Sequence, residues 1–144
     1  MKQPPLNKIL IVDDEENIRF ILKEAFAGEY AVFTASEGLS AVEIIKEERP
    51  AMVFLDINMP GLDGVAVLKL IKGTGQSPVI WMLTGVEDLE TVLQTLNMGA
   101  SGYITKPFDV GKIREIVSST MTASERKERR NPNDKPWQIK KSKK

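Results

Sequence analysis

An alternation of two kinds of segment, repeated five times, constrains the fold of this chain more than any other feature. Short apolar runs rich in β-branched residues, typical of buried strands, are each followed by apolar residues at helical spacing. The predicted strands are Ile9–Val12, Ala31–Thr34, Met52–Leu55, Val79–Leu83 and Gly102–Ile104. This strict alternation predicts an α/β fold, in which a five-stranded parallel sheet has helices on both faces. For this length, the doubly wound, flavodoxin-like strand order 2-1-3-4-5 fits best.

Each predicted helix carries one apolar stripe. The stripes comprise Ile18, Ile21, Leu22, Ala25 and Phe26 in the first helix, Ala41, Val42, Ile44 and Ile45 in the second, Val67, Leu68 and Ile71 in the third, Leu89, Val92, Leu93 and Leu96 in the fourth, and Val110, Ile113, Ile116 and Val117 in the last. Ser36, Asp63 and Asp109 stand at positions where a helix N-cap is expected. The stripes predict which helical faces pack on the sheet.

The composition removes several classes of chemistry. The 144 residues include no Cys and no His. Disulfides, thiol catalysis, cysteine-ligated zinc, Ser–His triads and a phosphohistidine on this chain are therefore excluded. Polar chemistry must come from carboxylates, hydroxyls, amines or a cation with oxygen ligands. The apolar runs are too short to span a bilayer and the N-terminus lacks the apolar region of a signal peptide, so we expect a cytoplasmic protein.

Charge divides the chain into an acidic body and a basic end. Residues 1–120 contain 11 Lys and Arg against 17 Asp and Glu, a net charge of −6, whereas residues 121–144 contain 9 against 3, a net charge of +6. We expect an N-terminal extension over 1–7, one domain over 8–121, and a basic helix extension with a flexible tail over 122–144. Contact of that tail with nucleic acid, anionic lipid or an acidic partner is the alternative.

Polar residues follow the predicted strands at one rim of the sheet. In a doubly wound sheet, ligands bind beyond the carboxyl ends of the strands, where the strand order reverses. The residues at these ends are Asp13 and Asp14, Asp56, Thr84, and Thr105 with Lys106. Three converging carboxylates repel one another, and a divalent cation relieves that repulsion. A few oxygen ligands with room for water and phosphate favour Mg2+. A carboxylate beside it is a competent nucleophile towards phosphorus.

Each of these residues also has a structural interpretation. Asp13 and Asp14 precede a predicted helix and could serve only as caps. Asp56 could be a turn residue, Thr84 could cap the following helix, and Lys106 could be a solvated surface lysine. The functional hypothesis depends on their coincidence at one rim rather than on any single residue.

Four motifs occur in order along the chain: ILIVDDEENIR, MVFLDINMPGLDG, VIWMLTG and GASGYITKPFD. Through them the chain, from about Lys8 to Thr120, resembles the receiver domain of two-component response regulators, of the chemotaxis type with a single domain. The resemblance implies a phosphorylation-dependent signalling switch that catalyses only its own phosphorylation and slow dephosphorylation. It implies a sensor histidine kinase or phosphotransfer protein as donor, a downstream protein target and a homodimer linked to phosphorylation. Neither a DNA-binding domain nor a membrane is expected.

By this resemblance, Asp56 is the phospho-acceptor. The ligands of Mg2+ would be Asp56, Asp14, Asp13 acting mainly through a water, and the backbone carbonyl of Asn58. The family also tunes the lifetime of the phosphoryl group at two positions, which are Asn58 and Val86 in this chain. Since apolar Val86 cannot orient an attacking water through a side-chain hydrogen bond, we expect slow self-hydrolysis.

The resemblance assigns the remaining site residues to the switch itself. Lys106 would pair with one phosphoryl oxygen and Thr84 would hydrogen-bond another. Tyr103 would turn inward when Thr84 moves, and the readout surface would be residues 87–118. The Lys106–Pro107 bond would be cis. The alternatives are an ordinary half-buried tyrosine at Tyr103 and a trans proline at the start of a helix.

Two other classes of function share parts of this pattern. Phosphatases of the haloacid dehalogenase type also use an Asp nucleophile, a Lys and Mg2+ on a doubly wound sheet. They place a second acid two residues after the nucleophile, where this chain has Asn58, and they usually carry a cap insertion. A docking module that has the receiver shape but is not phosphorylated is the other alternative. The complete set of acids, hydroxyl and lysine argues against it.

Overall fold

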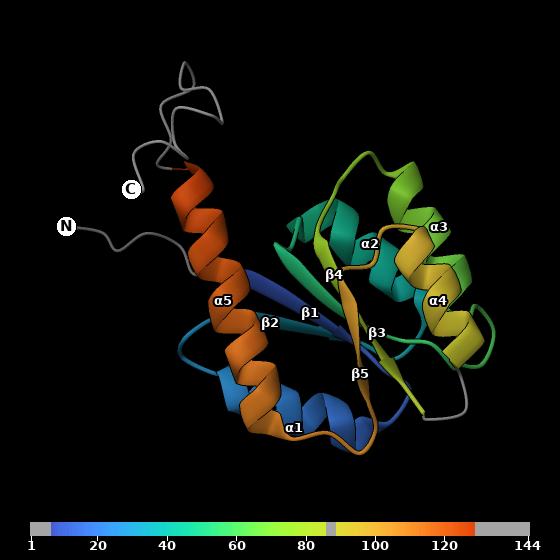
Figure 1. Ribbon diagram of the computed structural model, residues 1–144, viewed down its shortest axis with the longest axis horizontal. Coiled ribbons are helices and arrows are strands. Elements are labelled where there is room, and N and C mark those ends of the chain that lie inside the picture. The colour runs from blue at the N-terminus through green and yellow to red at the C-terminus, as the bar shows by residue number, and fades with distance from the viewer. Residues whose placement is uncertain (1–6, 86–88, 129–144) are drawn as a thin grey trace.

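The computed structural model of the chain describes residues 7–85 and 89–128, without the side chains of residues 124–128. Figure 1 shows how its strands and helices alternate. The strands are β1 (Lys8–Val12), β2 (Ala31–Ala35), β3 (Met52–Asp56), β4 (Val79–Thr84) and β5 (Gly102–Thr105). The helices are α1 (Glu16–Phe26), α2 (Gly38–Glu48), α3 (Gly64–Gly73), α4 (Leu89–Asn97) and α5 (Val110–Glu128).

Some predictions fall partly or wholly outside the described residues. These are the extension over 1–7, the tail within 122–144 and the role of Val86. Helix α5 runs past residue 121 to Glu128, and the division into a domain over 8–121 with two extensions stays a prediction. Among the described helices, none is long and apolar enough to cross a membrane.

The strands form one parallel sheet in the order β2-β1-β3-β4-β5, which confirms the predicted α/β fold and strand order. The register sets Val12 of β1 beside Leu55 of β3, and Thr84 of β4 beside Thr105 of β5. Because the strands run in one direction, their carboxyl ends meet at a single edge of the sheet. The residues that follow β1, β3 and β5 are therefore brought together there.

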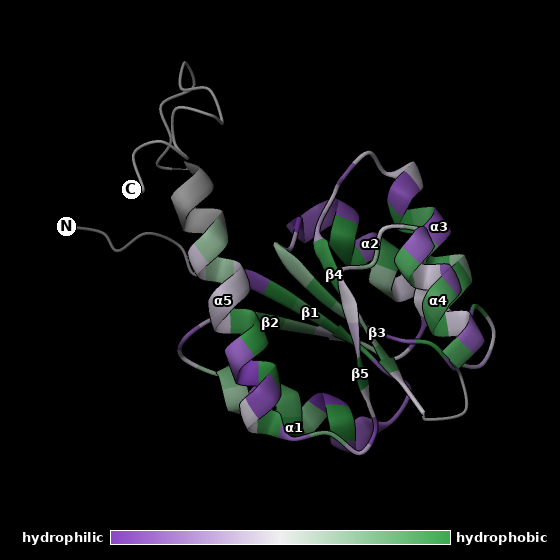
Figure 2. Ribbon diagram, in the orientation of Figure 1, coloured by the Kyte–Doolittle hydropathy of each residue, from purple (hydrophilic) through white to green (hydrophobic). Residues whose placement is uncertain are grey.

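The sheet is covered on both faces, as strands with two buried sides require. Figure 1 shows α1 and α5 over one face and α2, α3 and α4 over the other. Successive residues of a strand point to opposite faces. In β1, Ile9 and Ile11 therefore enter the core with α1 and α5, whereas Leu10 and Val12 enter the core with α2, α3 and α4. Figure 2 shows that the strands carry mostly hydrophobic residues, whereas the helices outside the sheet also carry hydrophilic ones.

The predicted apolar stripes are buried only where a helix faces the sheet directly. In α3 the whole stripe is buried, namely Val67, Leu68 and Ile71. In α1 the fully buried residues are Leu22 and Phe26, while Ile21 is 45% exposed. In α4, Leu89 and Leu93 are 57% and 54% exposed. Helical spacing thus predicted the apolar side of each helix, but these three residues lie outside the contact with the sheet.

Two of the three predicted N-caps are confirmed. Asp63 and Asp109 each accept a backbone N–H hydrogen bond of 2.9 Å from the first turn of the following helix. The prediction for Ser36 is wrong, because α2 begins at Gly38 and the extended residue before it is Glu37. Glu37 makes no side-chain capping hydrogen bond.

Gly64, the first residue of α3, lies directly against the end of β3. Its N–H donates a 2.8 Å hydrogen bond to the carbonyl of Ile57. A Cβ atom at this position would lie 2.7 Å from the backbone oxygen of Asp56 and 2.8 Å from the Cα of Ile57. Backbone atoms cannot rotate away as a side chain can, so only glycine fits. This close approach sets the path of the chain from Asp56 into α3.

We expect Gly64→Ala to lower the free energy of unfolding by roughly 1–3 kcal/mol, because the added methyl group overlaps backbone atoms. Gly73→Ala is the matched control at the other end of α3, where a Cβ would have nothing within 4 Å. That control should be neutral or gain up to about 1 kcal/mol from the helical preference of alanine. Urea denaturation measures both variants. Equal stabilities would contradict the close approach.

Candidate functional site

Asp13 and Asp56 lie side by side because the strands that precede them are paired. Val12 and Leu55 are register partners, so the next residue of each strand continues to the same edge. The backbone N–H of Asp13 extends the pairing, since it donates a 3.1 Å hydrogen bond to the carbonyl of Ala35. Asp13 is fully buried and Asp56 is 4% exposed. The sheet thus places two carboxyl groups in the interior at its carboxyl edge.

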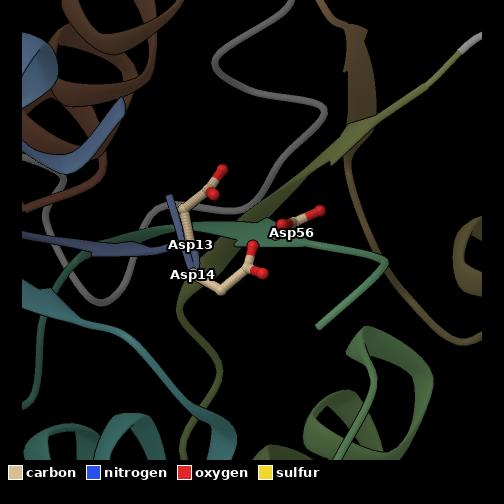
Figure 3. A group of neighbouring side chains, drawn as sticks. All are labelled: Asp13, Asp14 and Asp56. Carbon is tan, nitrogen blue, oxygen red and sulfur yellow. The ribbon is translucent and has the colours of Figure 1, made fainter. Parts of the chain in front are cut away.

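Asp14 completes a cluster with these two residues. Each of the three side chains offers one carboxylate oxygen, and these oxygens all lie within 4.8 Å of one another. Figure 3 shows the three side chains of Asp13, Asp14 and Asp56 gathered at the ends of their strands. Asp14 is exposed, so the cluster is open to solvent on its side. The structure therefore brings together the three acids that the sequence predicted to converge.

Backbone groups fix one oxygen of each buried carboxylate. The N–H of Glu15 donates to Asp13 Oδ1 at 2.9 Å, and the N–H of Asn58 donates to Asp56 Oδ1 at 3.1 Å. The side chain of Arg19 also holds the backbone here, since its Nη1 donates to the carbonyl of Asp13 at 2.8 Å. With both Oδ1 atoms engaged, the Oδ2 atoms are left for Lys106.

Lys106 reaches the cluster from the end of β5. Its backbone N–H donates a 2.7 Å hydrogen bond to the carbonyl of Thr84, which continues the pairing of β4 with β5. Its Nζ lies 2.8 Å from Asp13 Oδ2 and 3.4 Å from Asp56 Oδ2. It also lies 3.1 Å from Glu15 Oε2. The Lys106–Pro107 peptide bond is cis, as the sequence resemblance implied.

The environment shifts the protonation of both partners. Burial, and then the charge of Asp13, raise the pKa of Asp56 from 3.8 to about 7, although Lys106 and the N–H of Asn58 act in the opposite direction. Burial disfavours the charged form of Lys106. Its contacts with Asp13 and Glu15 outweigh that effect and hold the pKa of the ammonium above its ordinary value. Without a cation, the cluster therefore has a charged lysine beside an aspartate that readily binds a proton.

The residues present fit a divalent cation with oxygen ligands. Apart from its ion pair with Lys106, the buried Asp13 Oδ2 has no hydrogen-bond partner among the described residues. Hard carboxylate oxygens at this spacing suit Mg2+, and its charge would offset the excess of carboxylates over ammonium. Asp13, Asp14 and Asp56 would hold it. The carbonyl of Asn58, an exposed residue, stays a predicted ligand.

Neither of the two predicted switch residues, Thr84 and Tyr103, makes a hydrogen bond to the three aspartates among the described contacts. Thr84 is 1% exposed, and its hydroxyl donates a 2.9 Å hydrogen bond to the carbonyl of Gly85. Tyr103 on β5 is 42% exposed, so its ring lies in an outward position. Thr84 follows Leu83, the register partner of Asp56, and so lies at the same edge of the sheet, while the switch role of both residues stays a prediction.

Glu15 and Arg19 are site residues that the sequence reasoning missed. Glu15 is separated from Lys106 by 91 residues, and only the folded sheet brings their side chains together. The available signal was the run of acids DDEE, which continues beyond Asp13 and Asp14. Arg19 lies in the first turn of α1, and this position could have suggested that its side chain reaches back to the backbone just before the helix, where it contacts the carbonyl of Asp13.

Residues 9–118 match the family described as the response regulator receiver domain. Sporulation initiation phosphotransferase F of Bacillus subtilis is 40% identical over 111 residues, which cover 76% of this chain and 90% of that protein. Chemotaxis protein CheY of Halobacterium salinarum is 36% identical over 117 residues, 81% of this chain and 98% of that protein. Regulatory protein AtoC of Escherichia coli is 34% identical over 117 residues, but only 25% of that protein is covered.

Solved structures show the same fold. The receiver domain of NtrX from Brucella abortus superposes with a TM-score of 0.73 at 32% identity, covering 79% of this chain and 98% of that one. Chemotaxis protein CheY4 of Vibrio cholerae gives a TM-score of 0.72 at 28% identity, covering 80% of this chain and 98% of that one. The chain thus matches almost the whole length of some short proteins, but only one part of a much longer regulator.

Without divalent cations, we expect Asp56→Asn to be more stable than the parent protein at pH 8, by on the order of 2 kcal/mol. The folded protein keeps a proton on Asp56 up to a pKa of about 7, whereas the unfolded chain releases it near 3.8. The cost of burying the charged carboxylate is therefore absent below the unfolded pKa, grows as pH rises between these two values, and is constant above the higher one. Urea denaturation with a chelator, across this pH range, measures the difference.

Glu16→Gln is the control for this experiment, because Glu16 is exposed and loses the same charge. The difference in unfolding free energy between Glu16→Gln and the parent protein should not increase with pH. Added Mg2+ should narrow the gap between Asp56→Asn and the parent protein, since a bound cation favours the charged carboxylate. If the parent protein is as stable as Asp56→Asn at pH 8, burial of the charged Asp56 carboxylate does not destabilise the fold and this prediction is wrong.

Proposed function

The chain belongs to the response regulator receiver domains, a family of phosphorylation-dependent signalling switches, and we propose that Asp56 accepts the phosphoryl group. The observation that carries this proposal is the meeting of Asp13, Asp14 and Asp56 within 4.8 Å, with Lys106 Nζ 3.4 Å from Asp56 Oδ2. Asp13 is fully enclosed and Asp14 has no ion pair with Lys106 among the described contacts. Asp56 keeps a small exposed fraction of 4% and lies beside the ammonium of Lys106.

The proposed reaction is a transfer of phosphoryl to carboxylate. An oxygen of Asp56 attacks phosphorus, and an O–P bond forms as the bond from phosphorus to the donor breaks. The leaving group is an imidazole nitrogen when the donor is a phosphohistidine, and acetate when it is acetyl phosphate. The product is an acyl phosphate. This self-directed transfer and its slow hydrolysis are the only catalysis that we propose for the chain.

Mg2+ bound by Asp13, Asp14, Asp56 and the carbonyl of Asn58 would supply charge neutralisation for the carboxylate and the phosphoryl oxygens. The chain's own part is to hold the acids in place. The N–H of Asn58 orients the acceptor carboxylate, leaving its second oxygen towards Lys106. Lys106 then offers a charge-assisted hydrogen bond to a phosphoryl oxygen, and Thr84 offers another through its hydroxyl.

We propose that the signal leaves the site through Thr84 and Tyr103. A phosphoryl group adds roughly two negative charges, and it acts at a distance by favouring one of two existing conformations. Moving such an equilibrium from mostly off to mostly on requires about 5.5 kcal/mol of differential binding. The readout surface comprises α4, β5 and α5. The exposed side chains of Leu89, Leu93 and Tyr103 on this surface support its use in partner contact.

The expected partners are proteins. A sensor histidine kinase or phosphotransfer protein would donate the phosphoryl group, and a downstream protein, or a second copy of this chain, would bind the switched face. The relative in Bacillus subtilis is named as a phosphotransferase of sporulation initiation and the one in Halobacterium salinarum as a chemotaxis protein. We propose a phosphotransfer or protein-contact role of that kind, in the cytoplasm, without a DNA-binding or membrane function of the domain itself.

Family membership identifies a signalling domain, and not a phosphatase of the haloacid dehalogenase type. Asn58 agrees with this, because it stands where those phosphatases have their second acid. The remaining alternative is a receiver-shaped module that takes no phosphoryl group, and a labelling experiment tests it directly.

We expect acetyl phosphate with Mg2+ to add one phosphoryl group to the parent protein and none to Asp56→Asn, because the amide lacks the nucleophilic oxygen. Intact-mass spectrometry at low pH, where acyl phosphates survive, measures the addition. Asp63→Asn is the matched control, since Asp63 is a nearby carboxylate that serves as the cap of α3. Labelling of Asp56→Asn at the parent level would contradict the assignment.

Val86 supplies a separate prediction on the lifetime of the phosphoryl group, although it lies outside the described residues. Val86→Gln should speed hydrolysis of the acyl phosphate several-fold, because an amide can orient an attacking water and a valine cannot. The decay of the labelled protein after removal of acetyl phosphate measures the rate. Leu93→Gln, the same change in polarity at an exposed position of α4, should leave it unaltered. Equal rates for parent and Val86→Gln would contradict this role.

A further inference from the structure

Lys106 contacts Glu15, an acid that has no role in the proposed reaction, in addition to Asp13 and Asp56. Its Nζ lies 2.8 Å from Asp13, 3.1 Å from Glu15 and 3.4 Å from Asp56. The longest of these three contacts is with the residue that takes the phosphoryl group. Glu15 does not belong to the cluster of three aspartates, and its side chain is 59% exposed. The ammonium is therefore drawn partly outward, towards a carboxylate at the solvent side of the site.

The backbone of Glu15 is fixed although its side chain is exposed. Its N–H donates to Asp13 Oδ1 at 2.9 Å, and its carbonyl accepts from the N–H of Arg19 at 3.2 Å. It is the extended residue immediately before α1. Its side chain makes no capping hydrogen bond. The carboxylate of Glu15 can therefore be neutralised by substitution while the backbone bonds that orient Asp13 are kept.

We propose that Glu15 competes with the phosphoryl group for Lys106 and so opposes the phosphorylated state. This inference rests on the proposed function of Asp56. To pair with a phosphoryl oxygen on Asp56, the ammonium must turn inward and give up a carboxylate. A cation bound by the aspartates would weaken the attraction of Asp13, because it neutralises that charge. Glu15 lies outside the cluster, keeps its charge, and remains the competitor. It is a positioning residue that acts through Lys106.

The size of the effect follows from the exposure of the pair. Ion pairs with an exposed partner contribute little to stability, so loss of the Glu15 carboxylate should change the affinity for a phosphoryl mimic by only about two- to fivefold. The same exposure makes the effect sensitive to salt, since mobile ions screen charges at the surface more than buried ones. Glu15 thus adjusts the balance between the two states and does not abolish either.

The test measures the dissociation constant of beryllofluoride for the full chain saturated with Mg2+, by isothermal titration calorimetry. Glu15→Gln should bind about two- to fivefold more tightly than the parent, and the gain should shrink as salt is added. Glu16→Gln is the matched control: it removes the same charge one residue away, and Glu16 makes no ion pair among the described residues. Its affinity should equal that of the parent.

A crystal structure of the parent with Mg2+ and beryllofluoride gives a second, independent readout. Lys106 should contact the fluoride and no longer contact Glu15. An ammonium still paired with Glu15 overturns the inference. So does an affinity of Glu15→Gln that is equal to or weaker than that of the parent, or that is matched by Glu16→Gln. These outcomes leave the proposed function intact, whereas a parent protein that does not bind beryllofluoride at all overturns both.

Discussion

The burial of two neighbouring carboxylates at the end of the sheet is the constraint on which the site depends. The pairing of β1 with β3 sets Asp13 beside Asp56, and the apolar core beneath them leaves both almost without contact with water. Two anions in that position repel each other and are poorly solvated. One ammonium, from Lys106, lies within ion-pair distance of both. The remaining excess of negative charge fits the proposed binding of a divalent cation.

The same imbalance links stability to function. Burial raises the pKa of Asp56 to about 7, so the folded protein tolerates this residue best when it is protonated or beside a cation. A side chain chosen only for stability would not be an aspartate. Around it, the backbone leaves little room for adjustment, because Gly64 brings the start of α3 against the carbonyl of Asp56. The frame around these charges is therefore tightly packed on the side of α3.

Much of this arrangement could be predicted from the sequence, and the failures have physical reasons. Buried parallel strands appear as unbroken apolar runs, and strict alternation with helices leaves few topologies, so Asp13, Asp56 and Lys106 could be placed on one rim. Ser36 was misplaced as a cap because the chain stays extended for one residue more than its position suggested. Ile21 was misplaced in the core because helical spacing gives the direction of a face and not the width of its contact.

By itself, then, the sequence determined the fold class, the strand order and the identity of the acids at the carboxyl edge, because these depend on local periodicity and on the order of segments. Only the tertiary structure decided how the side chains share their charges. The 3.1 Å contact of Lys106 with Glu15 joins residues 91 positions apart. The contacts of Lys106 with Asp13, Glu15 and Asp56 differ by less than one ångström, at 2.8, 3.1 and 3.4 Å. Such small differences arise from how the folded segments pack, and no spacing along the chain encodes them.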